Sequence, residues 1–594
     1  MKKTRLYLLS LLTVPALALT GCFNLDEQAY SEIVQESFVP RDQDVAALLA
    51  SSYSELGTFF DWYGMFDVQE EPADVVITPV RPNGWDDGGV YQRMHAHTWK
   101  DEDTGSPDVL YSTCYTGINN ANRVLDQVID GSLPCGDLTD YIIDELHAIR
   151  ALWYAILLDN FGNVPIVTTF ASDSLPEQIS RKGVYNYVVK EFKDVIDHKV
   201  LSEENSASTY GRLNLWGVKM ALMRVYLNAE VYTGTPAYDK ALEVALDVIN
   251  NGPYSLSADY SDNFKSDVGP SNTEIIFAIP YSATYETGSH VFCQGMKWFP
   301  PTEGAAHFGY SFQTWGGSCG NPQFINSYQP GDLRKDKTWL HGQQMCKDSP
   351  SEIAWTCLNY LPSISGAQGT NSFLSVDFGC RENKYEVDVD AANGNQWDND
   401  FAWFRLAEAY YTAAECLLRG ATASGALQPE DYVNAVRARS METGVSTLTK
   451  ADLEADTKMV YGLVPWGDLT KEIYDECYTS HDWSAYMDQL EASQGNENVS
   501  SKGKDKDVLA LGGMYDEWGW EFALEGQRRQ QMIRFGTFTT RNWYNHSALS
   551  DTHTALFPIP KSVLNTNLKL GQNPGYVSSN GNMAADMVLA EFTE

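Results

Sequence analysis

Apolar residues recur at intervals of three and four along the first half of the chain, which is the spacing of one face of an α-helix. Short polar connections separate these segments, so we expect successive helices to pack as antiparallel pairs. The residues Phe161-Gly162-Asn163 form a glycine stop after one of them. The pattern predicts helices at Asp44–Trp62, Tyr111–Ile129, Thr139–Phe161, Gly183–Lys199, Asn214–Thr233 and Pro236–Asn250.

The last two of these helices carry small residues and tyrosines at spacings that let two helices approach closely, as in tetratricopeptide repeats. A second unit of this kind runs from Phe401 to Gly420 and from Tyr432 to Ser440. Because the two units are far apart in the sequence, we expect a degenerate scaffold rather than a tandem solenoid. Ordinary packing of each hairpin by itself remains an alternative.

Two stretches, 251–400 and 441–515, lack this pattern and are rich in Gly, Pro, Ser, Asn and aromatic residues. Long irregular segments in a compact protein are usually functional or disordered, and the aromatic residues argue against disorder. A strand-like run occurs at Glu274–Ile279, and the polar run Gln494–Asp507 is expected to be a loop. The chain is therefore expected to be mostly α, with a loop-rich half that has minor β structure.

The N-terminus has the features of a bacterial lipoprotein signal. A basic start is followed by the apolar segment Leu6–Ala18 and by Leu19-Thr20-Gly21-Cys22. We expect residues 1–21 to be removed and Cys22 to be acylated, which anchors the chain without spanning the membrane. An ordinary secretory signal is the alternative. No later stretch approaches the roughly 18 apolar residues that a membrane helix needs.

Charge and aromatic content narrow the class of partner. A net charge of -37 and a pI near 4.5 disfavour nucleic acid and anionic membrane surfaces, since both would repel the chain. The 16 Trp and 33 Tyr exceed what an average core requires, and sugar rings pack their C–H faces on aromatic rings. The ten cysteines are scattered without a C-x-x-C pair, so no zinc ribbon is indicated. Disulfides among the loop cysteines in the range from Cys293 to Cys380 stay open, and the sequence does not indicate which would pair.

The order of motifs from Cys22 to Tyr576 resembles the SusD/RagB family of nutrient-binding outer-membrane lipoproteins. Each motif alone is weak, but their collinear order is specific. The motifs are Trp85-Asp86-Asp87-Gly88-Gly89, His97-Thr98-Trp99, Gly117-Ile118-Asn119-Asn120-Ala121-Asn122-Arg123, Ala148-Ile149-Arg150-Ala151-Leu152-Trp153-Tyr154, Phe161-Gly162-Asn163-Val164-Pro165, Tyr210-Gly211-Arg212, Asn434-Ala435-Val436-Arg437-Ala438-Arg439, Glu521-Phe522-Ala523-Leu524-Glu525-Gly526-Gln527-Arg528, Leu556-Phe557-Pro558-Ile559-Pro560 and Gln572-Asn573-Pro574-Gly575-Tyr576.

The resemblance implies one SusD-like domain over 22–594 with four repeat-type hairpins and a ligand-facing irregular half. It also implies a cell-surface, outer-membrane lipoprotein that binds an oligo- or polysaccharide and acts as the lid of a TonB-dependent, SusC-like transporter. The stretch 441–515 is longer than the family usually has. Arg437, Arg439, Glu525 and Arg528 are expected to pair within the helical core rather than to form a site.

The resemblance places a ligand-stacking tryptophan at Trp85, in a loop with Asn83 and other polar residues. It places the rest of an aromatic platform in the irregular half. Such sites combine an apolar surface with a few convergent polar groups. Packing of Trp85 within its own loop, and an internal ion pair for the two charged candidates, are the alternatives. The candidate glycan-binding residues are Asp67, Arg81, Asn83, Trp85, Trp298, Tyr310 and Trp315.

No sequence feature indicates catalysis. With 79 acidic residues, a pair of carboxylates such as a glycosidase uses always exists, so their abundance proves nothing. The motifs G-x-S-x-G, H-E-x-x-H and the P-loop are absent. We therefore expect no enzyme and no cofactor, with a surface calcium ion near Asp388 and Asp390 left open. Peptide binding by the same scaffold and glycoside hydrolysis remain the alternative functions.

Overall fold

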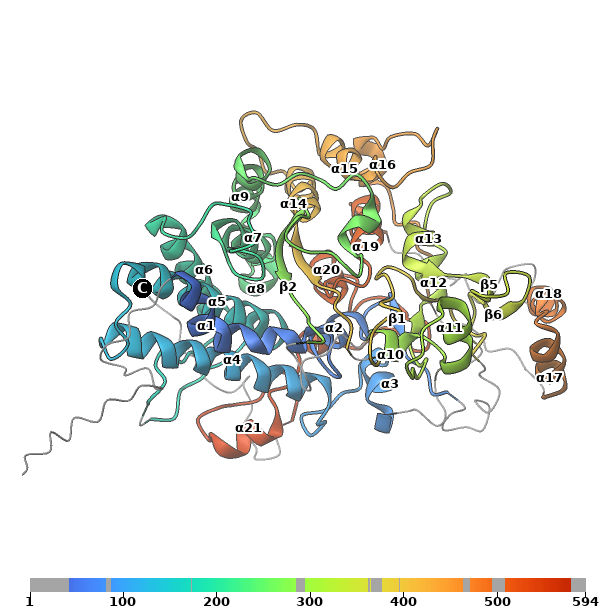
Figure 1. The fold of residues 1–594 in the computed structure, drawn as a ribbon, viewed down its shortest axis with the longest axis horizontal. Coiled ribbons are helices and arrows are strands. Elements are labelled where there is room, and N and C mark those ends of the chain that lie inside the picture. Colours follow the sequence, from blue (N-terminus) through green and yellow to red (C-terminus); the bar gives the residue numbers. More distant parts are fainter. Residues whose placement is uncertain are drawn as a thin grey trace, which may run out of the picture.

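The computed structural model describes residues 42–81, 87–172, 174–284, 294–361, 364, 376–394, 396–462, 471–493 and 508–577. One part of the molecule is a stack of helices, and the other consists of loops, short strands and short helices (Figure 1). The mostly helical fold class is thus confirmed. The stack contains α4 (Ser106–Ile129), α5 (Thr139–Asn160), α6 (Arg181–His198), α7 (Leu215–Leu227), α8 (Ala229–Thr233), α9 (Tyr238–Asn251), α14 (Leu406–Leu418) and α15 (Pro429–Arg437).

The helices of the stack pack in a continuous series, from α4 through α5, α6, α7 and α9 to α14 and α15. Helices α9 and α14 are neighbours in space although the loop-rich stretch separates them in the sequence. The predicted helical hairpins are confirmed. The two units are far apart in the sequence but adjacent in space, because the intervening 150 or so residues leave the stack and return to it.

Local signals set where several helices begin and end. The Ser180 hydroxyl accepts the Gly183 N–H at 3.0 Å and caps the start of α6. Gly162 has a φ of 67°, and its N–H donates to the Leu157 carbonyl at 3.0 Å, which confirms the predicted glycine stop after α5. The single helix predicted over 214–233 breaks at Asn228, whose side chain bonds back to the preceding turn at 2.9 Å.

The N-terminal described segment lies against the stack and leads into the loop-rich part. The helix predicted from Asp44 to Trp62 is shorter than expected, because its second half is a 3₁₀ helix that ends before Trp62. This segment contains α1 (Asp42–Tyr53), η2 (Ser54–Phe60), α2 (Met65–Glu70), β1 (Val76–Ile77), η3 (Asp87–Gly89) and α3 (Val90–His95), and η4 (Gly136–Leu138) precedes α5.

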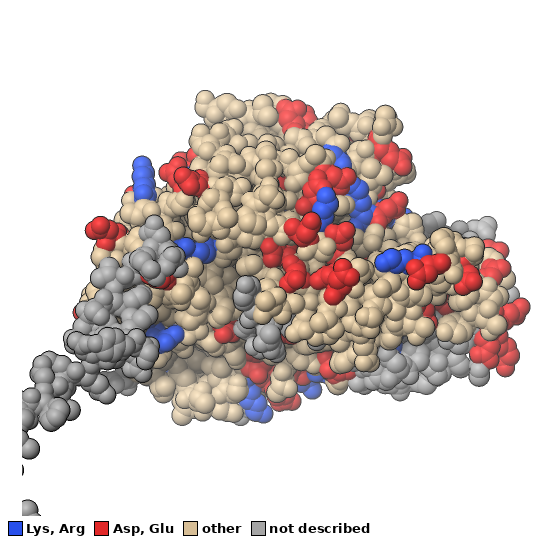
Figure 2. Space-filling model, viewed as in Figure 1, with Lys and Arg blue, Asp and Glu red and all other residues tan. Residues whose placement is uncertain are grey.

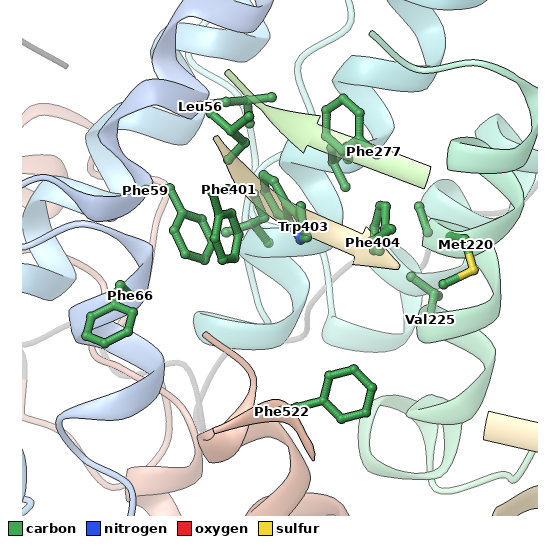
Figure 3. Close-up of a cluster of buried hydrophobic side chains, with 14 of the residues drawn as sticks. Leu56, Phe59, Phe66, Met220, Val225, Phe277, Phe401, Trp403, Phe404 and Phe522 are labelled. Carbon is green, nitrogen blue, oxygen red and sulfur yellow. The ribbon is translucent and has the colours of Figure 1, made fainter. Parts of the chain in front are cut away.

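Strands β2 (Ile275–Ile279) and β8 (Phe401–Arg405) pair antiparallel where the two parts of the molecule meet. The strand predicted near Ile275 is confirmed. The helix predicted from Phe401 begins only at Leu406, because the buried aromatic run before it pairs with β2. Figure 3 shows Phe401, Trp403 and Phe404 among side chains from η2, α7 and the C-terminal segment, and the Phe59 ring stacks on Phe401 at 4.1 Å.

The loop-rich part is held by three further two-stranded antiparallel pairings, of β1 with β3, β4 with β7 and β5 with β6. The cysteines described in the structure are thiols, and Cys319, Cys357 and Cys380 are buried. The elements of the loop-rich part are η5 (Tyr260–Asn263), α10 (Gln294–Trp298), α11 (Pro301–Phe308), β3 (Cys319–Gly320), α12 (Pro322–Ile325), α13 (Arg334–Thr338), β4 (Trp339–Leu340), β5 (Gly342–Met345), β6 (Ile353–Cys357) and β7 (Arg381–Glu382).

The stretch 441–515 is less irregular than expected, because it contains α16 (Lys450–Glu454), α17 (Lys471–Ser480) and α18 (Ser484–Ser493). The last two lie at one edge of the molecule (Figure 1). Cys477, Trp483 and Tyr486 anchor them in a second, smaller hydrophobic cluster with Phe378. The predicted loop 494–507 lies outside the described residues.

The C-terminal segment returns to the main core through α19 (Gly512–Phe522), α20 (Arg528–Phe535), η8 (His553–Ala555) and α21 (Lys561–Thr566). The side chains of Arg437, Arg439, Glu525 and Arg528 are each at most 5% exposed and are ion-paired, as predicted. In the part of the chain that the structure describes, no helix is both long and apolar enough to span a membrane.

Candidate ligand-binding platform

Two tryptophans from distant segments form a joint aromatic surface in the loop-rich part. Trp62 is half-buried in the turn between η2 and α2, and Trp315 lies in the loop after α11 with 38% of its surface exposed. Their ring centroids are 5.3 Å apart, and the ring planes are inclined by 32°. We call this pair of rings the platform. It offers the apolar surface on which a sugar ring or another flat ligand can pack.

The turn that carries Trp62 is held in an uncommon backbone conformation. Tyr63 has a φ of 62°, in the left-handed region that bulky residues rarely adopt. Its N–H donates to Asp67 Oδ2 at 2.8 Å, and its hydroxyl donates to Asp87. Burial, followed by the neighbouring Asp87 carboxylate, raises the pKa of Tyr63, so its hydroxyl is a protonated donor at neutral pH.

A buried ion pair lies under the platform. The Lys297 ammonium contacts Asp67 Oδ1 at 2.6 Å, and both side chains are almost fully shielded from solvent. The ammonium also lies 5.2 Å from the centre of the Trp62 ring and 5.7 Å from that of Tyr91. Of the alternatives for Asp67, the structure therefore favours the internal ion pair, with Lys297 rather than Arg81 as its partner.

Trp298 and Tyr310 do not lie on the exposed surface of the platform. Trp298 is fully buried and packs against Trp339, with ring centroids 6.1 Å apart. Tyr310 is 4% exposed, stacks on Phe312 at 4.2 Å and shares a hydrogen bond with Thr314 at 3.2 Å. Their assignment to the platform is corrected, because both rings are enclosed by the aromatic core of the loop-rich part.

Arg81 is also enclosed, and its guanidinium donates to the Gly317 carbonyl at 3.1 Å and the Phe378 carbonyl at 2.9 Å. It therefore braces the loop that carries Trp315 rather than reaching a ligand. Asn83, Trp85 and Cys22 lie outside the described residues, so their assignments stay predictions. The loop of Trp85 leaves the described chain at Arg81 and rejoins it at Asp87, beside Tyr63.

The sequence patterns missed Trp62 and Tyr63, since they placed Trp62 at the end of a long helix. Asp61 and Gly64 were the available signal, because both residue types favour turns. In the structure the Gly64 N–H donates to the Asp61 carbonyl at 3.0 Å and closes that turn. A helical pattern would have counted the Trp62 indole as core. In the turn it is only half-buried.

The electrostatic setting favours a neutral ligand. Acidic side chains outnumber basic ones on the face seen in Figure 2, where charged residues gather near the middle of the view. The described residues contain no group of three or more His, Cys, Asp or Glu side chains that could hold a metal ion. The platform can supply aromatic packing and hydrogen bonds.

Two hollows of about 640 and 550 Å³ lie elsewhere, on the helical stack. Their walls come from α6, α7, α9 and the segment after α14. They mix lysines with carboxylates, as in the pair Lys219–Asp247 at 2.7 Å, and no tryptophan lines either one. We regard the platform as the better candidate, because it presents two neighbouring tryptophan rings, whereas the aromatic residues of the hollows are tyrosines and cations lie over Tyr226 and Tyr238.

Comparison with known proteins agrees with the fold. In Bacteroides thetaiotaomicron, the starch-binding protein SusD is 25% identical over 473 residues, which is 73% of this chain and 72% of that protein. The SusD-like protein P25 of Formosa agariphila is 22% identical over 533 residues, covering 79% and 89% of the two chains. The surface glycan-binding protein A of Bacteroides fluxus superposes with a TM-score of 0.64 at 16% identity, over 90% of this chain and all of that one.

The surface glycan-binding protein A of Bacteroides thetaiotaomicron, solved with laminarihexaose, gives a TM-score of 0.60 at 18% identity and covers 89% and 99% of the two chains. These structural likenesses establish the fold alone. A family model described as "Starch-binding associating with outer membrane" matches residues 25–227. The model of the SusD family matches residues 273–576, which is more than half of the sequence, and the chain therefore belongs to the SusD/RagB family.

Proposed function

We propose that this protein is a non-catalytic, cell-surface glycan-binding lipoprotein that uses the Trp62–Trp315 platform, completed by the loop of Trp85, to hold an oligosaccharide. The observation that carries the proposal is the exposed Trp315 ring beside Trp62 in the loop-rich part. A relative whose name describes starch binding, and a structural neighbour solved with laminarihexaose, support a glycan as ligand.

The physical basis of binding is the packing of the C–H face of a sugar ring on the exposed Trp315 ring, against which Trp62 packs at 5.3 Å. Hydroxyl groups of the ligand would then reach polar atoms at the rim, such as the Asp87 carboxylate and the Tyr63 hydroxyl. Each ring packed in this way contributes favourable contact area, and the polar rim sets orientation.

The test is calorimetry or affinity electrophoresis with starch, laminarin and a wider glycan panel. Replacing Trp315 by Ala should weaken binding of the recognised glycan at least ~10-fold, since losing an aromatic anchor typically costs 2 kcal/mol or more, on the order of the hot-spot values for aromatic residues. Phe170→Ala is the matched control, because Phe170 is also an exposed aromatic residue but lies next to the helical stack. It should bind as the wild type does.

Three results would contradict this function. Unchanged binding by the Trp315→Ala variant would remove the platform. Binding of peptides but of no glycan would favour the scaffold as a peptide receptor. Release of shorter sugars from a glycan panel would show a hydrolase instead.

We further propose that Cys22 carries the lipid anchor and that the protein delivers its ligand to a TonB-dependent, SusC-like transporter, which it covers as a lid. The description of the matching family model, which names the outer membrane, supports the location. Affinity purification of the tagged chain from outer membranes should co-purify a large β-barrel receptor. Cys22→Ala should release the protein from the membrane, and its retention would contradict the anchor.

A further inference from the structure

The platform consists of two chain segments that themselves lie outside the helices and strands. One is the turn 61–64 with Trp62 and Tyr63, and the other is the loop around Trp315 that follows α10 and α11. An aromatic surface built in this way keeps its shape only if something fastens one segment to the other. The pairing of β1 with β3 and the Arg81 bond to the Gly317 carbonyl fasten the chain beside these segments. Directly under the two rings lies one further fastening, the buried pair of Asp67 and Lys297.

Asp67 organises the turn side of the platform. Its Oδ2 accepts the Tyr63 N–H at 2.8 Å and the Tyr91 hydroxyl at 3.2 Å, while its Oδ1 accepts from Lys297 at 2.6 Å. The bond to Tyr63 stabilises the left-handed backbone at that residue, which directs the adjacent indole of Trp62. The Asp67 carboxylate thus accepts hydrogen bonds from Tyr63 in the turn, from the Tyr91 hydroxyl and from the Lys297 ammonium at the same time.

Lys297 organises the other side. Its carbonyl accepts the Ser318 N–H at 2.9 Å, and the carbonyl of the preceding Met296 accepts the Trp315 N–H at 2.9 Å. The backbone at Lys297 is therefore bonded to both ends of the short loop that presents Trp315. Its ammonium reaches across to Asp67 and lies against the Trp62 ring.

We propose that Asp67 and Lys297 are positioning residues that lock the two tryptophans of the platform into one binding surface, rather than residues that contact the ligand. This inference rests on the proposed function of the platform. Both side chains are at most 1% exposed, so neither can reach a hydroxyl group of a bound sugar in this conformation. A charge-assisted bond in a water-poor setting is strong and directional, which suits this role.

A direct ligand and a positioning residue predict different behaviour. If Asp67 bound the sugar itself, its loss and the loss of Lys297 would act separately and their effects on affinity would multiply. If the two act through one bond, breaking it from either side has the same consequence, and the double variant is no worse than the single ones. A shift of about 1 Å in a supporting group can lower function by up to ~100-fold, so the effect is measurable.

The experiment compares Lys297→Met, Asp67→Asn and the double variant with the control Lys384→Met in the full chain. Lys384 is a matched control, because it is a buried lysine that contacts Glu525 at 2.5 Å and lies over the rings of Tyr260 and Phe264. It has no described contact with the platform. Laminarin and starch serve as probes in calorimetry, and hydrogen exchange is followed in peptides covering 61–68 and 314–318.

We expect each single platform variant to lose ~10-fold or more in affinity, which corresponds to about 1.4 kcal/mol, and the double variant to match them within about twofold. Exchange should accelerate in both peptides, although each substitution touches only one segment. Lys384→Met should lower thermal stability and leave affinity and these two peptides unchanged.

Multiplicative losses in the double variant would overturn the proposal, as would faster exchange confined to the substituted segment. Equal loss of affinity in Lys384→Met would also overturn it, since a general loss of stability would then explain the result. If the wild type binds no glycan of the panel, the proposed function fails. The exchange data would still decide whether the ion pair couples the two segments.

Discussion

The helical stack and the loop-rich part satisfy their buried backbone carbonyls in different ways. In the loop-rich part, buried cations donate to carbonyls that no helix or sheet uses: Arg81 to Phe378 at 2.9 Å, Arg381 to Val376 at 2.8 Å and Lys384 to Ala523 at 2.7 Å. In the stack, comparable bonds occur at helix ends. Arg181, for example, donates to the last carbonyls of α5 and to one in α8.

The difference follows from the backbone. A helix bonds its own carbonyls, so the stack needs side-chain donors for its backbone mainly at the helix ends. A buried irregular segment must find other donors, and long cationic side chains supply them. A carboxylate stabilises a buried cation of this kind where one is in reach, as Glu525 does for Lys384. Buried cations in the loop-rich part thus satisfy backbone carbonyls, whereas buried ion pairs in the stack, such as Arg224 with Glu408 at 2.6 Å, join helices whose own carbonyls are already bonded.

Breaking the ionic network should have the largest effect on stability. Arg405, at the end of β8, contacts Glu274 at 3.1 Å and both Glu521 and Glu525 at 2.8 Å. Burial alone would raise the pKa of Glu521, but the guanidinium groups of Arg405 and its neighbours hold it well below its usual range. Arg405→Met leaves these carboxylates short of a partner, so we expect a loss of about 3–5 kcal/mol in thermal or urea denaturation.

The control for this prediction is Arg419→Met in the stack. Arg419 contacts Glu415 at 2.8 Å, but its side chain is 18% exposed and Glu415 keeps Arg534 as a partner. We expect a loss of only about 0–1 kcal/mol. Equal losses in the two variants would show that buried charge matters no more at the junction of the two parts than it does on the stack.

A change of shape should affect the stack next most strongly. A Cβ atom at Gly117 in α4 would lie 2.3 Å from the indole of Trp153 in α5, so these helices approach too closely for alanine. Gly117→Ala gains about 1 kcal/mol in helix propensity, but we expect the clash to outweigh this gain. The free energy of unfolding should fall by about 1–3 kcal/mol net, which a lower thermal unfolding midpoint would show. Glycan affinity should not change, because the platform lies in the other part.

The double variant Gly117→Ala with Trp153→Phe tests the cause of that loss. The smaller ring makes room for the new methyl group, although it gives up the bond from Trp153 to the Ser52 carbonyl at 3.1 Å. We expect the double variant to be more stable than the sum of the two single changes implies. Simple additivity would mean that the contact between α4 and α5 does not limit stability.

The same contrast explains what the sequence could predict. Helix positions, the Gly162 stop and the burial of Arg437 followed from local patterns, because helices are specified largely by neighbouring residues. The platform did not. Trp298 and Trp315 belong to the same irregular stretch, yet one is buried against Trp339 and the other lies exposed beside Trp62. Contacts with segments remote in the sequence decide between these outcomes, and no periodic pattern records them.

Alkaline pH should weaken the loop-rich part by a smaller amount. Burial raises the pKa of Glu382 in β7 to about 8, against which bonds from the Tyr385 and Lys384 N–H groups and the Lys384 charge act only in part. Below that pH the folded protein holds a proton that the unfolded chain releases near pH 4.5. The free energy of unfolding therefore falls as pH rises from 4.5 through 8, by about 1 kcal/mol between pH 7 and 8. Glu382→Gln cannot release this proton, so its thermal midpoint should decline less over this interval than the wild-type midpoint. Parallel declines would show that Glu382 is already ionised in the folded protein and that its burial is compensated by neighbouring charge.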